Sequence, residues 1–102
     1  MRASTRRRTP ADDAGRAALS PRWRLLPDRL EADIALAGFA QVRAFVTGLM
    51  DLADALDHHP EVRFGYRQVS VTWTTHDSGG VTALDWRAAA ATDRLLESVS
   101  PS

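Results

Sequence analysis

The fold is decided by residues 39–60, FAQVRAFVTGLMDLADALDHHP, in which apolar side chains recur every three to four positions. That spacing indicates a helix with one apolar face, and it predicts a helix from about Phe39 to Asp57. Pro60 stops this helix, because the residue before a proline avoids the helical region. A long amphipathic helix needs an apolar surface to cover, and the flanking sequence supplies one.

On both sides of this helix, apolar residues alternate with polar ones, which predicts half-buried strands. The predicted strands are residues 23–25, 30–36, 62–66 and 69–75. We expect Phe45, Tyr66 and Trp73 to lie in the core. A short helix is predicted at residues 11–19, and a last helix runs from a capping box at residues 82–85 to about residue 97.

The predicted order is therefore α-β-β-α-β-β-α. Strands with a single apolar face imply a four-stranded antiparallel sheet with helices packed on one face, which is an α+β fold. Since 102 residues allow one domain, we expect a single domain at residues 11–98 and a disordered arginine-rich tail at residues 1–10.

Composition excludes several classes of function. There is no cysteine, so disulfides and thiolate metal sites are excluded and a reducing compartment is allowed. We expect a cytoplasmic location. No apolar run approaches the roughly 18 residues of a membrane span, and no secretory signal is recognised. The first ten residues carry four arginines and no acid, and the remainder is mildly acidic. A mildly acidic domain is poorly suited to binding nucleic acid.

All three histidines lie within residues 58–76, and histidine exchanges protons near neutral pH. Asp54 precedes His58 by one helical turn, so we expect it to orient His58. His59 is held extended by the following proline, so its ring should diverge from that of His58, which disfavours a shared zinc ion. His76 is placed by alternation on the polar face of its strand, and Asp85 is first of all a helix-capping residue. The alternative is a set of ordinary surface histidines beside surface acids.

The spacing of these residues resembles the signature of the pterin-4a-carbinolamine dehydratases, also called 4a-hydroxytetrahydrobiopterin dehydratases. In that family an acidic residue is followed after three positions by His-His-Pro, then by an aromatic residue, a histidine and an aspartate. The matching residues are Asp54, His58-His59-Pro60, Tyr66, His76 and Asp85, with Thr75-His76 and Gly80-Val81-Thr82 fitting two further family stretches. The resemblance covers residues 23–96.

The resemblance implies that the protein removes water from a 4a-hydroxytetrahydropterin without a cofactor or a metal. His58 and His76 are then the catalytic acid and base, in an order that the sequence leaves open, with Asp54 fixing the tautomer of His58. His59 would contact the pterin substrate, and Asp85 would lie near it. Family members associate, so a homodimer or homotetramer is expected. The alternative is a non-catalytic protein-binding or accessory factor on the same fold.

Overall fold

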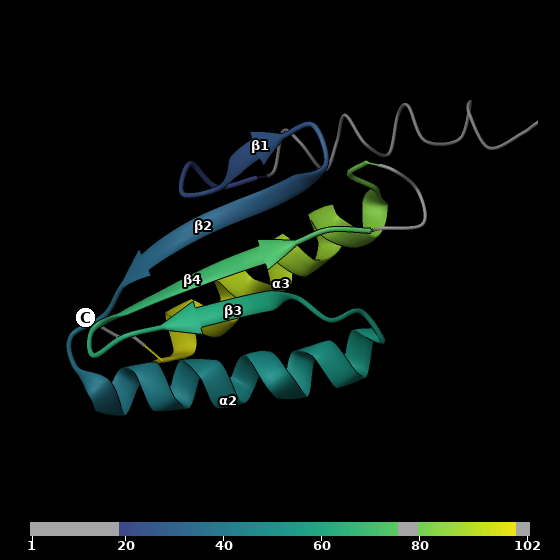
Figure 1. Cartoon of the computed structure of the whole chain (residues 1–102). Coiled ribbons are helices and arrows are strands. Elements are labelled where there is room, and N and C mark those ends of the chain that lie inside the picture. Colours follow the sequence, from purple (N-terminus) through teal and green to yellow (C-terminus); the bar gives the residue numbers. More distant parts are fainter. Residues whose placement is uncertain (1–18, 76–79, 100–102) are drawn as a thin grey trace, which may run out of the picture.

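The computed structural model of the chain describes residues 19–75 and 80–99, whose arrangement is shown in Figure 1. The described elements are β1 (Arg24–Leu26), β2 (Arg29–Ala35), α2 (Phe39–Leu56), β3 (Glu61–Phe64), β4 (Gln68–Trp73) and α3 (Ala83–Val99). The strands form one antiparallel sheet in the order β1-β2-β4-β3, which confirms the predicted α+β class. The tail and helix predicted before residue 19, and His76, lie outside the described residues.

One face of the sheet is apolar because the two central strands pair with their apolar residues opposite each other. The register of β2 and β4 runs from Leu30↔Trp73 to Ala35↔Gln68, and directly paired residues point to the same face. The buried residues of this face are Leu30, Ala32, Ile34, Val69, Val71 and Trp73. Both described helices lie on this side of the sheet, with α3 behind it and α2 along β3 (Figure 1). Neither described helix has the length and apolar character needed to cross a membrane.

Helix α2 buries the predicted stripe of Val42, Phe45, Leu49 and Ala53. It also approaches α3 closely at Gly48, where an added Cβ would lie 2.6 Å from a methyl carbon of Leu95. A residue without a side chain at this point therefore lets the two helices pack together, and their packing closes the core beneath the sheet.

The end of α2 differs from the prediction, and the difference positions the site. The helix ends at Leu56, because Asp57 adopts the left-handed conformation with φ 52° and ψ 43°. The N–H of Asp57 bonds to the carbonyl of Asp54, and the N–H of His58 bonds to the carbonyl of Ala53. These two bonds form a Schellman motif, a frequent helix ending. The turn, rather than Pro60, ends the helix and fixes the backbone of His58.

Two of the three expected core aromatics are buried. Phe45 and Trp73 have no exposed surface, and the indole N–H of Trp73 donates to Thr92 on α3 over 3.1 Å. The prediction for Tyr66 is wrong, because its side chain is 70% exposed. Tyr66 lies in the turn after β3, where strand alternation no longer directs it, and its ring stacks on that of Phe39 at 6.2 Å.

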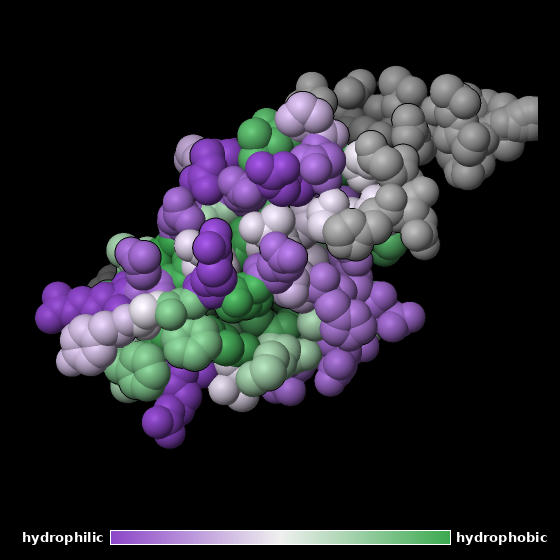
Figure 2. Space-filling view, viewed as in Figure 1, coloured by the Kyte–Doolittle hydropathy of each residue, from purple (hydrophilic) through white to green (hydrophobic). Residues whose placement is uncertain are grey.

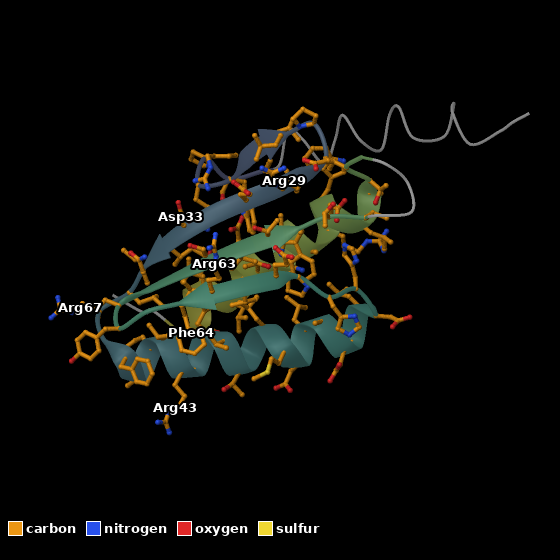
Figure 3. The ribbon with its side chains drawn as sticks, in the orientation of Figure 1. Arg29, Asp33, Arg43, Arg63, Phe64 and Arg67 are labelled. Atoms are coloured by element: carbon orange, nitrogen blue, oxygen red, sulfur yellow. The ribbon has the colours of Figure 1, made fainter. Side chains whose placement is uncertain are left out.

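The opposite face of the sheet is polar. Arg29 and Arg24 donate to Glu31, and their hydrogen bonds hold the pKa of Glu31 below its usual value. The hydroxyl of Ser70 donates to Asp33 and, together with Arg24, lowers the pKa of that carboxyl. Figure 3 labels Arg29 and Asp33 along β2. Exposed pairs of this kind add little to stability, so this face is a solvated surface.

Candidate functional site

A histidine–aspartate pair joins the end of α2 to the first turn of α3. The Nε2 atom of His58 lies 2.7 Å from Oδ1 of Asp85. The side chain of Asp85 is fully buried and that of His58 is 11% exposed. The imidazole also packs on the indole of Trp73, with ring centroids 5.3 Å apart and a tilt of 30°. A buried carboxylate on one side and an aromatic ring on another therefore restrict the orientation of His58.

Asp85 is held in place by two further donors, both of which reach its Oδ2 atom. The backbone N–H of Thr82 donates over 3.0 Å, which is the predicted capping bond, and the hydroxyl of Thr75 donates over 2.9 Å. Both donors lie on Oδ2, so a carboxylate at this position also accepts at Oδ1 from His58. The proton of neutral His58 then resides on Nε2, and the lone pair resides on Nδ1.

Asp54 does not pair with His58, contrary to the expectation from helical spacing. Asp54 is 83% exposed and lies 3.8 Å from Nε2 of His59, which is itself 65% exposed. The Schellman turn explains the difference, because it takes His58 off the helical path that would have placed it one turn above Asp54. The structure thus brings Asp85 to His58, and leaves Asp54 and His59 together on the surface.

His59 and Asp54 line a groove of about 490 Å³ between α2 and β3. The other lining residues are mostly apolar: Val46, Leu49, Met50, Ala53, Pro60, Val62 and Phe64. Figure 2 shows hydrophobic surface over α2 and β3 below the hydrophilic face of the sheet. Beside His59, the structure therefore provides an apolar groove that could receive a flat ring or another protein surface.

Among residues 19–75 and 80–99, no group of three or more His, Cys, Asp or Glu side chains could hold a metal ion. Since His76 lies outside these ranges, the metal-free site stays a prediction. Sequence reasoning missed the roles of Thr75 and Thr82, which were noted as matching family positions. The capping box predicts the hydrogen bond between Thr82 and Asp85. It does not indicate that Asp85 also contacts Thr75 and His58.

The fold and the site define a small antiparallel α+β protein with a buried histidine–aspartate pair, and comparisons with known proteins identify its family. The family model described as pterin 4 alpha carbinolamine dehydratase matches residues 8–95. The chain therefore belongs to the pterin-4a-carbinolamine dehydratase family.

Individual relatives agree with the family assignment. A protein of Chloroflexus aurantiacus, provisionally named a pterin-4-alpha-carbinolamine dehydratase, is 38% identical over 90 residues, covering 88% of this chain and 97% of the relative. A relative with the same provisional name from Thermosynechococcus vestitus is 39% identical over 79 residues, covering 78% and 83%.

Two solved structures have a similar fold. One is the transcriptional coactivator/pterin dehydratase from Brucella melitensis, with a TM-score of 0.75, 28% identity and coverage of 83% of this chain and 92% of that one. The other is a pterin dehydratase-like protein identified as a RuBisCO assembly factor in the alpha-carboxysome, with a TM-score of 0.65, 28% identity and coverage of 72% and 88%.

Proposed function

We propose that this protein dehydrates 4a-hydroxytetrahydropterin to quinonoid dihydropterin by histidine acid/base catalysis, as part of pterin recycling. The observation that carries the proposal is the buried pair of His58 and Asp85. A surface histidine needs no buried carboxylate partner, whereas a histidine that must present one nitrogen in one tautomer does.

The reaction requires one proton to leave and one to be added. The N5 proton of the substrate passes to a base, the C4a–O bond breaks, and the 4a hydroxyl takes a proton and departs as water while the N5=C4a double bond forms. Groups that exchange protons near neutral pH suit both steps. We assign one step to Nδ1 of His58 and the other to His76, as the family resemblance implies. Asp85 takes the tautomer-fixing role that helical spacing had suggested for Asp54.

His59 is assigned to substrate binding, as the family resemblance implies, and its side chain is 65% exposed. Asp54, 3.8 Å from it, then acts on His59 rather than on His58. Asp85 serves through His58 instead of by direct contact with the pterin.

The test is a dehydration assay on enzymatically generated 4a-hydroxytetrahydropterin, in the presence and absence of a chelator. We expect turnover above the spontaneous rate in both cases. Absence of turnover contradicts the proposal, and activity that a chelator abolishes and zinc restores contradicts the metal-free mechanism.

The alternative is a non-catalytic accessory role, since a similar structure is identified as a RuBisCO assembly factor. The pairing of His58 with Asp85 favours catalysis here, because a binding surface gains nothing from a buried charge whose burial is costly. The same assay separates the two functions, as an accessory protein leaves the spontaneous rate unchanged.

We also propose that two copies associate through β3 and α2. Strand β3 pairs only with β4 in the described sheet, so its outer edge is open, and open edges favour pairing with another chain. Among the residues that the structure describes, four of the six exposed large hydrophobic residues lie on this side of the molecule: Phe39, Met50, Phe64 and Tyr66. A hydrophobic patch beside an unpaired edge is typical of an interface.

Charges on β3 select one register for this pairing. We consider two β3 strands, one from each copy, that pair in an antiparallel way about a two-fold axis. If the helices of both copies lie on one side of the joined sheet, paired residues must point to the same face of it. An axis at Arg63 would place two arginines opposite each other, whereas an axis at Val62 places Glu61 opposite Arg63 of the second copy. Opposite charges in cross-strand pairs stabilise a sheet and like charges destabilise it, so the axis at Val62 is favoured.

The exposed stripe of α2 suits the same two-fold axis. Its members are Arg43, Thr47, Met50 and Asp54, and Met50 borders the same groove as Val62. An axis near Met50 brings Arg43 of one copy toward Asp54 of the second copy. Figure 3 shows Arg43 pointing away from the sheet at this side of the molecule.

Light scattering tests the interface. We expect a mass of at least twice the 11.2 kDa of one chain for the wild type, and about one chain for Arg63→Glu, which would face Glu61 of the second copy. The double variant Glu61→Arg/Arg63→Glu exchanges the charges and should restore association. An Arg63→Glu protein that stays associated, or a double variant that stays monomeric, contradicts this register.

A further inference from the structure

The hydroxyl of Thr75 occupies a position in the site that catalysis by histidine alone does not explain. Thr75 follows β4, on the side of the sheet that faces α3, and its Oγ1 lies 2.9 Å from Oδ2 of Asp85 and 3.1 Å from Oγ1 of Thr82. We propose that Thr75 is a positioning residue, which holds the Asp85 carboxylate in the orientation that keeps the proton of His58 on Nε2. The proposal rests on the dehydratase function above and deepens it.

The direction of each hydrogen bond follows from the number of protons available. A threonine hydroxyl has one hydrogen, and that of Thr75 is donated to Asp85. The contact between the two hydroxyls must then use the hydrogen of Thr82. Oγ1 of Thr82 in turn accepts the backbone N–H of Leu84 over 3.2 Å. The chain of donors thus runs from Leu84 through Thr82 and Thr75 to Asp85.

Asp85 receives this chain at Oδ2 and the imidazole of His58 at Oδ1. The two oxygens are approached from different elements, so the carboxylate plane is fixed by donors on both sides. Hydrogen bonds in such a chain polarise one another, which strengthens the donor that Thr75 presents to Oδ2. Removal of the Thr75 hydroxyl leaves Oδ2 with the N–H of Thr82 as its one remaining donor among the described residues, so the carboxylate plane is held less firmly.

The test compares Thr75→Val, which removes the hydroxyl at nearly constant shape, with Thr75→Ser, which retains it. Nitrogen NMR of the imidazole reports the His58 tautomer without any need for turnover. We expect Thr75→Val to lower the Nε2–H population of His58 and to reduce kcat by about 10- to 100-fold at unchanged KM, the range for loss of a partner that orients a functional histidine. Thr75→Ser should keep both the Nε2–H population of His58 and kcat near their wild-type values.

Thr74→Val is the matched control, because the hydroxyl of Thr74 donates to the backbone carbonyl of Asp28 and takes no part in the network. It should change neither tautomer nor kcat. If Thr75→Val does not fold, Thr75→Ala provides the same comparison with a smaller side chain.

The proposal is overturned if loss of the Thr75 hydroxyl leaves the tautomer and kcat unchanged, or if Thr75→Ser behaves as Thr75→Val does. A wild-type protein without dehydratase activity would overturn the proposed function instead. The NMR comparison would then still decide whether Thr75 positions Asp85, so the two failures remain distinguishable.

Discussion

Asp85→Asn is the most specific test of the site. It replaces one oxygen of a fully buried carboxylate by an NH₂ group, and it should change the tautomer of His58. Two donors point at Oδ2, the hydroxyl of Thr75 and the N–H of Thr82, so the amide oxygen of asparagine should occupy that position. The amide NH₂ then faces Nε2 of His58, which must become an acceptor. The proton of His58 is expected to move to Nδ1, the nitrogen assigned to the substrate.

The cost in stability can be worked from the same contacts. Three hydrogen bonds to a charged oxygen become neutral, with a loss of about 1 kcal/mol each, and relief from burying a charge offsets part of the total. We expect the free energy of unfolding to fall by about 2 kcal/mol, which for a domain of this size lowers Tm by about 8–16 °C. The fold should persist, because asparagine still accepts the capping bond from Thr82.

The cost in activity should be larger than the cost in stability. A histidine held in the wrong tautomer lowers kcat by about 10⁴-fold where a buried aspartate orients it, and we expect a fall of about 10²- to 10⁴-fold here. Kinetics below the new Tm and nitrogen NMR of His58 provide the two measurements. Asp93→Asn is the control, since Asp93 lies on the same helix and binds Arg22 and Trp23, away from His58. Unchanged kcat in Asp85→Asn, despite a proton moved to Nδ1, would refute the reasoning.

Three further predictions follow from the assigned roles and from the turn after α2. His58→Ala and His76→Ala should each lower kcat by about 10²- to 10⁴-fold, the usual contribution of a general acid or base, whereas His59→Ala should mainly raise KM; equal kcat losses for all three with KM unchanged would contradict the division. Asp57→Gly should raise the free energy of unfolding, measured with denaturant, by about 1 kcal/mol, because glycine adopts the left-handed conformation without steric strain and the change removes a negative charge from a helix C-terminus. A lower free energy of unfolding would contradict this prediction. Deletion of residues 1–10 should leave both Tm and turnover unchanged, and a large fall in Tm would show that this segment contributes to the fold.

The fold was predictable because local patterns and tertiary burial agree in most elements. The 3.6-residue stripe of α2 and the alternation in β2 and β4 each mark a face that the structure buries. Disagreement is confined to places where the chain turns. Tyr66 continues the alternation of β3 in the sequence, but the strand ends at Phe64, so its side chain points to solvent.

The partner of His58 could not be predicted from the sequence in the same way. Helical spacing favours Asp54, four residues away, whereas Asp85 is 27 residues away and reaches His58 only when α3 packs beside α2. Whether the chain continues as a helix through residue 57 decides between the two aspartates. A single left-handed residue settles that question, and no periodicity in the sequence reports it.

The left-handed turn at Asp57 also has a consequence for how the chain can vary in length. Each residue added to a helix turns the following side chain by about 100° and moves it by 1.5 Å. One residue inserted or deleted in the last turn of α2 would thus rotate the imidazole away from Asp85. At the end of this helix the number of residues is constrained as strongly as their identity, because the position of the left-handed residue decides whether His58 reaches its partner.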